Sequence, residues 1–319
     1  MPRIAYINLE MSRAITIMGS FVADVAFRTS AMPQWGETLM GTSFRLGPGG
    51  KGSNQAVAAA RLAGNVSFVS KLGSDAFGEI ARRLYREEGI ETSCVFESQE
   101  EATGAAAILI HESKGENGII VVPGACFHLT DQELRKASKV IVRSVVFLTQ
   151  LEQDLAVVER GLRYAHDAGV TTILNPAPAA KLPDSIYPLC DFLTPNESEA
   201  SALTDIPVND TNGAERAADV LLARGVRLVL VTLGANGAFL KTQDGAKHIP
   251  AIDAGSVVDT TGAGDAFNGG LAVALAEGMS AEDAVRFGCA AAGLSVTRHG
   301  TAPSMPHRAE VDKLLMRKA

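Results

Sequence analysis

The sequence has few cysteines, and their spacing gives no sign of a disulfide framework or a zinc site. Cys94, Cys126, Cys190 and Cys289 are widely scattered and include no CxxC pair, so reduced and mostly buried thiols are expected. The six histidines are equally dispersed, and no two lie four residues apart. A histidine-ligated metal is therefore disfavoured.

Long apolar runs and dense positive charge are also missing. No run reaches the roughly 18 residues that span a bilayer, and residues 1–10 lack a basic leader followed by an apolar segment. The formal net charge is −7, and no Lys/Arg cluster provides an electrostatic footprint for nucleic acid. These absences predict a cytoplasmic protein with small-molecule partners, rather than nucleic acid or a membrane.

What is present is enough for one large α/β domain. The chain has 319 residues, of which 46% are hydrophobic and 31 are glycine, so it can bury a sizeable core. Residues 1–12 are interpreted as a flexible lead-in, and residues 13–319 as the domain. From residue 139 onward, the pattern predicts a strand over 140–150, an amphipathic helix through Ala168 and a strand from 170. This alternation indicates a parallel sheet covered by helices on both faces.

Two β-rich runs interrupt this alternation earlier in the chain. Residues 103–110 and 117–125 are separated only by a polar turn, with no helix between them. Such runs predict an antiparallel pair that belongs to a small β structure apart from the main sheet.

Residues 259–270, DTTGAGDAFNGG, carry the strongest chemical signal. Gly262-Ala263-Gly264 leads directly into an apolar helix, with Asp265 on its first turn. Free N–H groups and the helix dipole at such a start attract an anionic group. A carboxylate there would repel a phosphate, but it can take a proton from an attacking hydroxyl. The layout predicts a phosphoryl-transfer site; the alternative is that Asp265 only caps the helix.

A second glycine-rich segment, GPGGKGSN, begins at Gly47. Its formal GxGxxG match is a weak sign of a dinucleotide fold, because Pro48 interrupts it and no suitable acidic residue follows. A Walker A loop is absent, since Lys51 precedes glycine. What remains is a glycine turn with Lys51 and Asn54 on the first turn of an alanine-rich helix. A solvated role for Lys51 is disfavoured by the glycines on both sides.

Other polar residues have two interpretations each. Asp24 lies between apolar neighbours and either pairs with a core donor or faces a ligand. Glu152 follows a strand at the carboxyl edge, where open α/β sheets bind ligands, or it is an exposed loop residue. Asn196 and Glu199 have the spacing of a capping box, which sequence alone favours.

The strings DTTGAGDAFNGG and GGKGSNQA resemble the C-terminal and N-terminal signatures of the ribokinase-like carbohydrate kinases, also called the phosphofructokinase-B family. The resemblance extends from about residue 15 to about residue 315. It implies a parallel-sheet α/β/α sandwich with a small β-sheet lid formed by segments near 25–48 and 103–124. Lids of this kind often clasp, which implies a homodimer.

The resemblance also implies a function. It is that of an ATP-dependent sugar kinase that phosphorylates the terminal 5-hydroxyl of D-ribose. Other pentose, nucleoside or hexose kinases of the family are alternatives, and so is a catalytically silent sugar- or nucleotide-sensing relative. Val22 marks a departure, because ribokinases usually have asparagine there and deoxyribokinases an apolar residue. An unpaired 2-hydroxyl would cost about 1–3 kcal/mol, so 2-deoxyribose is a second candidate substrate.

The residue roles implied by the resemblance fall into four groups. Asp265 is the catalytic base, and the amides of Gly262, Ala263 and Gly264 form the anion hole. The sugar is held by Asp24, Gly50, Lys51, Asn54, Glu152 and Asp265. ATP contacts Asn196, Thr232, Gly234, Gly237, Gly264 and Cys289, the last standing where the family often has histidine. Among metal sites, Glu199 orders magnesium-bound waters, and an activating potassium ion is held by Asp259, Thr261, Ser295, Arg298, Gly300 and Ser304.

Two of these groups also have plain structural interpretations. Gly234 and Gly237 alone would only mark a hairpin. The segment after Ser295 could be a simple loop between helices.

Overall fold

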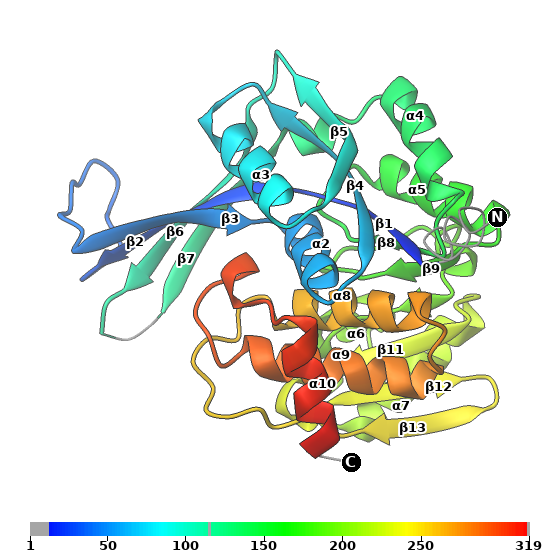
Figure 1. The fold of residues 1–319 in the computed structure, drawn as a ribbon. Helices are drawn as coiled ribbons and strands as arrows, with labels where there is room; N and C mark the ends of the chain where they lie inside the picture. Colours follow the sequence, from blue (N-terminus) through cyan, green and yellow to red (C-terminus); the bar gives the residue numbers. More distant parts are fainter. Residues whose placement is uncertain (1–12, 114–115, 318–319) are drawn as a thin grey trace.

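The computed structural model describes residues 13–113 and 116–317; the predicted lead-in at 1–12 lies outside them. A large central sheet forms the body of the molecule, and a smaller sheet projects from one side (Figure 1). The large sheet has nine strands in the order β13-β12-β11-β10-β9-β8-β1-β4-β5.

All pairings in the large sheet from β5 to β11 are parallel, and only β12 and β13 are antiparallel. Its strands are β1 (Ala14–Met18), β4 (Asn65–Gly73), β5 (Glu91–Ser98), β8 (Val146–Thr149), β9 (Thr171–Leu174), β10 (Phe192–Leu193), β11 (Leu228–Thr232), β12 (Ala238–Thr242) and β13 (Gly245–Ile249). The predicted mostly parallel sheet is confirmed.

Helices cover both faces of this sheet. One face packs on α2 (Lys51–Arg61), α3 (Ala76–Glu87), α8 (Ala263–Ala276), α9 (Ala281–Ser295) and α10 (Arg308–Arg317). The other packs on α4 (Asp131–Ile141), α5 (Leu155–Asp167), α6 (Glu197–Thr204) and α7 (Thr211–Ala223). Alternate strand residues supply the two cores, so Ile15 and Ile17 lie in the first and Met18 in the second. The α/β/α sandwich is confirmed.

The smaller sheet has the strand order β3-β2-β6-β7. Its strands are β2 (Val22–Thr29), β3 (Ser43–Gly49), β6 (Thr103–His111) and β7 (Asn117–Gly124). The antiparallel pairing of β6 and β7 is as predicted. The segment from Gly47 to Gly49 lies within β3 rather than in a loop, and the turn that leads into α2 is at Gly50, with φ 86°.

One predicted strand is partly wrong. A strand is predicted over 140–150, but α4 runs through Ile141 and β8 begins only at Val146. A reciprocal capping box between Thr130 and Glu133 starts this helix. Its buried residues Leu134, Ala137 and Ile141 recur at helical spacing and pack in the second core. Tertiary packing therefore overrides the β-branched composition of the segment.

Within the described residues, none of the helices has both the length and the apolar composition that crossing a bilayer would require.

Candidate active site

Asp265 lies on the first turn of α8 and is almost completely buried, with 6% of its surface exposed. Its Oδ2 accepts a hydrogen bond from Asn54 Nδ2 at 2.9 Å, and its Oδ1 accepts one from Gln55 Nε2 at 3.0 Å. Burial raises the pKa of the carboxyl to about 6, although Lys51, Asn54 and Gln55 lower it. Asp265 is therefore more than a helix cap: it is a buried acid held by two side-chain amides.

The start of α8 is open. Gly262 is its N-cap, with φ 81°, and no side chain caps the helix. Ala263 N donates to Thr260 O at 3.2 Å, but in the part of the chain that the structure describes, the N–H groups of Gly264 and Asp265 have no acceptor. A Cβ placed on Gly264 would meet no atom within 4 Å. Open space and unpaired N–H groups together form a seat for an anion.

The start of α2 is closed by a residue from far along the chain. Glu152 Oε2 accepts hydrogen bonds from Lys51 N at 2.8 Å and from Ser20 Oγ. Glu152 is thus not an exposed loop residue but fixes the glycine turn against the end of β8. Gly50 must be glycine, because an added Cβ would lie 2.7 Å from Val22 N. Sequence reasoning missed Ser20, whose only signal was its place just after the first strand.

Asp24 enters the same region from β2. Its carboxylate has no hydrogen-bond partner among the described residues, so the core-donor alternative is not observed. The side chain lies against Gly49, where a Cβ would be 2.3 Å from Asp24 Oδ2. Burial raises its pKa to about 6, and the negative charges of Glu152 and Asp265 add to the effect. Three acids from three distant segments therefore converge.

Lys51 supplies positive charge within this acidic cluster. Burial lowers the pKa of its ammonium group, but Asp265, Glu152 and Glu199 raise it, and the net result is a raised pKa. Lys51 is therefore cationic at neutral pH. It lies on the first turn of α2, where the glycine turn was predicted to place it.

The start of α6 has the capping box that the sequence favoured. Asn196 Oδ1 accepts from Glu199 N at 2.8 Å, and Glu199 Oε2 accepts from Asn196 N at 2.9 Å. Yet Glu199 is only 7% exposed. Burial raises the pKa of its carboxyl more than the hydrogen bond from Asn196 N and the charge of Lys51 lower it, so the net pKa is raised. The cap thus borders the acidic cluster.

Most of the residues predicted to contact ATP lie at or just beyond the carboxyl ends of β10 and β11, whereas Gly264 and Cys289 lie on α8 and α9. Thr232 pairs with Asn196 in an isolated bridge, and a Cβ on Gly234 would lie 4.0 Å from Glu197 Oε1. Gly237 has φ 89°, and a Cβ there would lie 2.1 Å from Ile249 O, so the turn itself requires glycine. Cys289 is buried in α9, and burial raises the pKa of its thiol to about 12.

The residues predicted to hold potassium lie just before α8 and from the last residue of α9, Ser295, onward. Asp259 accepts hydrogen bonds from Thr261 N at 2.9 Å and Gly300 N at 3.0 Å. Burial raises the pKa of Asp259, but the side chain of Thr261, these main-chain hydrogen bonds and the charge of His299 lower it more, so the net pKa is lowered. Arg298 N donates to Ser295 O at 3.1 Å. The hydrogen bond from Gly300 N to Asp259 therefore brings together two loops that lie about 40 residues apart in the sequence.

Ser304 and Arg298 each have a local partner. Ser304 Oγ donates to Thr301 O at 2.8 Å, and the guanidinium of Arg298 pairs with Glu310. The side chain of Arg298 is thus turned toward α10, and only its main-chain oxygen is available to an ion.

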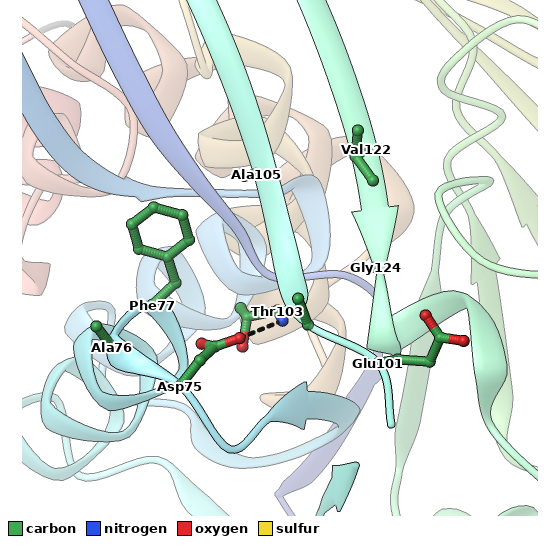
Figure 2. Close-up of a pocket in the computed structure, with 9 residues that line it drawn as sticks. Asp75, Ala76, Phe77, Glu101, Thr103, Ala105, Val122 and Gly124 are labelled. Carbon is green, nitrogen blue, oxygen red and sulfur yellow. Dashed lines mark hydrogen bonds between the residues drawn. The ribbon is translucent and has the colours of Figure 1, made fainter. Parts of the chain in front are cut away.

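A cavity of about 420 Å³ lies between the start of α3 and the strands β6 and β7. Figure 2 shows its lining, in which Asp75 Oδ2 accepts from Thr103 N at 2.7 Å. The other oxygen of Asp75 caps α3 through Gly78 N. None of the predicted site residues lines this cavity. The Asp75 carboxylate in its lining already accepts hydrogen bonds from two main-chain N–H groups.

The geometry around Asp265 can be compared with known proteins. A family model described as pfkB family carbohydrate kinase matches residues 12–308. The chain belongs to this family. It is therefore a carbohydrate kinase, a phosphotransferase.

Several relatives align with almost the whole length of this kinase. The chain is 41% identical over 305 residues to the ribokinase of Haemophilus influenzae, and the alignment covers 96% of this chain and 99% of that protein. It is 36% identical to the deoxyribokinase of Salmonella typhi, covering 92% and 95%. A structure of Arabidopsis thaliana ribokinase complexed with ribose and ATP matches with a TM-score of 0.89 at 34% identity, covering 95% of this chain and 98% of that one.

Proposed function

We propose that this kinase transfers the γ-phosphoryl group of ATP to the terminal 5-hydroxyl of D-ribose. The observation that carries the proposal is the position of Asp265 beside the open start of α8. With a pKa of about 6, its carboxyl is ionised at neutral pH and can accept a proton. The similarity to the ribokinases of Haemophilus influenzae and Arabidopsis thaliana supports ribose and ATP as substrates.

The proposed step divides the chemistry between Asp265 and the main chain. The sugar oxygen attacks the γ-phosphorus, the bond from this phosphorus to the β–γ bridging oxygen breaks, and the hydroxyl proton passes to Asp265. The N–H groups of Gly262 to Gly264 stabilise charge on the transferred group. Ala263 contributes after giving up its 3.2 Å hydrogen bond to Thr260 O.

The sugar is oriented by the residues around the glycine turn at Gly50. Asn54 donates to Asp265, but its Oδ1 is buried and has no partner in the described part of the chain. A sugar hydroxyl that donates to Oδ1 would satisfy this atom. The unpaired carboxylate of Asp24 is a second acceptor for the sugar. Lys51 and Glu152 complete the binding set, which supplies the proximity part of catalysis.

ATP would lie along the edge formed by Asn196, Thr232 and Gly234, with its terminal phosphate at Gly264. Gly237 contributes by allowing the turn at this edge rather than by contact. Cys289 would form only part of the apolar surroundings of the nucleotide, since its thiol is buried and neutral.

Magnesium fits the acidic side of this arrangement. Glu199 uses Oε2 for the cap of α6, while its Oε1 has no hydrogen-bond partner among the described residues. Magnesium is commonly held by one or two carboxylates together with waters and phosphates. The ion would neutralise phosphate charge, and Glu199 would hold its waters.

Potassium fits the loops at Asp259 and Gly300. The predicted donors are all oxygens, as hard cations require, and the side chain of Arg298 is directed away to Glu310. A bound ion there would order the segment that leads into α8. The ligands would be Asp259, Thr261, Ser295, Arg298, Gly300 and Ser304.

The small sheet serves in this proposal as a lid over the sugar and as a dimer contact. Segments 25–48 and 103–124 form the lid on a single kinase domain, residues 13–319. Several of its apolar side chains are exposed, including Phe44 at 68%, Ile120 at 71% and Val122 at 60%. An exposed apolar patch of this kind marks an interaction surface. Light scattering should give the mass of a dimer, and Ile120→Lys should shift it toward the monomer.

A second candidate substrate is 2-deoxyribose, because Val22 is buried at the start of β2. It is 4% exposed and lies next to the glycine turn. Its apolar side chain cannot pair with a 2-hydroxyl, and the Salmonella typhi relative is a deoxyribokinase. An unpaired hydroxyl costs about 1–3 kcal/mol.

The test is ADP formation with ribose, 2-deoxyribose and a panel of other sugars. Comparable kcat/KM values for the two pentoses would support the inference that Val22 leaves the 2-hydroxyl of ribose unpaired. Val22→Asn should then raise kcat/KM for ribose relative to 2-deoxyribose. A strong preference of the unaltered enzyme for ribose would remove the second candidate. If the enzyme turned over neither pentose, the proposal would be overturned.

We propose that this kinase acts in the cytoplasm, because the reaction consumes ATP.

A further inference from the structure

A chain of buried side-chain amides leads away from Asp265, and the proposed phosphoryl transfer does not use it. Its centre is Gln55 on α2, which is completely buried. Gln55 Nε2 donates to Asp265 Oδ1 at 3.0 Å and to Asn175 Oδ1 at 3.1 Å. Gln55 Oε1 accepts from Gln150 Nε2. Both hydrogens of the amide and its oxygen are thus engaged.

The directions of the Asn175 and Gln55 amides are fixed. Asn175 Nδ2 donates to Thr194 O at 3.1 Å, and a main-chain carbonyl can only accept. Asn175 therefore presents its Oδ1 to Gln55, and Gln55 has to donate to it. The carboxylate of Asp265 imposes the same direction from the other side. Gln55 cannot flip its amide without losing three hydrogen bonds in a region closed to water.

We propose that Gln55 is the positioning residue of the catalytic carboxylate. Its fixed amide holds Asp265 Oδ1, while Asn54 holds Oδ2 at 2.9 Å. The two amides hold both oxygens, so the carboxylate is kept in a single orientation about its Cβ–Cγ bond. The inference rests on the proposed role of Asp265 as the base, and it adds Gln55, Gln150 and Asn175 as the support of that base.

Hydrogen bonds to a carboxylate also stabilise its charged form. Burial raises the pKa of Asp265 and the charge of Glu152 adds to this, while the ammonium group of Lys51 and the amides of Asn54 and Gln55 lower it. Loss of the Gln55 amide therefore has two consequences for the base. It gains rotational freedom, and it takes up a proton at higher pH.

The decisive variant is Gln55→Met, which keeps the length of the side chain and removes the donor. We expect kcat to fall about 10- to 100-fold, as for a small misplacement of a catalytic group. The KM values for ribose and ATP should change less than about twofold, because Gln55 touches neither in the proposed arrangement. The acid limb of the pH profile of kcat/KM should move to higher pH.

Thr16→Val is a matched control. Thr16 is completely buried and shares a hydrogen bond of 2.6 Å with Ser144 Oγ, so its loss also removes one buried polar contact. This variant should lower Tm and leave kcat and the pH profile unchanged. If Gln55→Met behaves in the same way, Gln55 is only structural and the inference is wrong.

Two further measurements keep the inference testable if Gln55→Met folds poorly. Gln150→Met removes the donor behind Gln55, and it should shift the acid limb in the same direction by a smaller amount. In an Asp265→Asn background, Gln55→Met should reduce kcat no further, because it acts through Asp265. An unshifted acid limb in Gln150→Met, or a full additional loss in the double variant, contradicts the inference. Inactivity of the unaltered enzyme on every sugar would instead overturn the proposed function.

Discussion

Two helices begin at the same site, and they begin in opposite ways. At α6, Asn196 and Glu199 satisfy each other's main-chain N–H groups in a reciprocal capping box. At α8, Gly262 offers no side chain, and the N–H groups of Gly264 and Asp265 find no acceptor among the described residues. One start is closed by the protein itself, and the other is left to a ligand.

The capped start of α6 contributes to stability, whereas the open start of α8 is the one that we assign to catalysis. A capping box is worth about 1 kcal/mol to a helix, and α8 forgoes it. Instead, α8 is anchored by its apolar length, since nearly all of its residues from Asp265 onward are buried. A helix held by its core can leave its first turn free to bind an anion.

The largest effect is expected from Asp265→Asn at the open start. The amide keeps the shape but cannot accept a proton, so kcat should fall about 10²- to 10⁴-fold, the usual contribution of a general base. ADP release measures the rate, and Tm should change by only a few degrees. The matched control is Asp210→Asn at the start of α7, where Asp210 caps Gly213 N. If both variants lost all activity, the loss in Asp265→Asn would not distinguish a catalytic base from a helix cap.

Gly264→Ala should separate folding from chemistry at α8. The methyl group would meet no protein atom within 4 Å, and alanine stabilises a helix by about 0.5–1 kcal/mol relative to glycine. Tm should therefore stay constant or rise. The same methyl would occupy the space in front of the unpaired N–H groups, so kcat should fall about 10- to 100-fold. Unchanged turnover would mean that the phosphate binds elsewhere.

Glu199→Gln tests whether the closed start of α6 is more than a cap. The glutamine oxygen can still accept from Asn196 N, so we expect Tm to change little. The negative charge is lost, and the magnesium concentration needed for half-maximal rate should rise about 10-fold, as is typical when a residue that orients metal ligands is replaced. A lower Tm with an unchanged magnesium dependence would limit Glu199 to capping.

The pH profile should report the acids of the site. Burial raises the pKa of both Asp265 and Asp24 to about 6. A raised carboxyl pKa means that the base becomes protonated as the pH falls through 6, and kcat/KM should then decrease about tenfold per pH unit. An acid limb near pH 4, the ordinary value for a carboxyl, would contradict this assignment.

Much of the architecture was accessible from the sequence because the later chain alternates regularly. Residues 170–174 and 228–232 are short runs rich in β-branched and apolar residues, and their length and the turns that bound them mark them as strands. The strand β5 was not predicted. It lies at the edge of the sheet, and its first residues, Glu91 to Ser93, are exposed and polar. Edge position removes the apolar pattern on which such a prediction depends.

The site was accessible through short motifs but not through long-range contacts. The glycine turn before Asp265 and the glycines beside Lys51 are local signals. The convergence of Asp24 and Glu152 with them depends on the order of strands in two sheets, which no local spacing encodes. Gln55 had a local signal that went unused, since a glutamine is unexpected on the buried face of an alanine-rich helix.

We place phosphoryl transfer at the open start of α8. A crystal structure with ribose and a non-hydrolysable ATP analogue would test this placement. We expect the terminal phosphate within hydrogen-bonding distance of the N–H groups at the start of α8, from Gly262 to Asp265, and the 5-hydroxyl of the sugar within reach of the Asp265 carboxylate. A terminal phosphate bound away from α8, or a sugar whose 5-hydroxyl points away from Asp265, would contradict the claim.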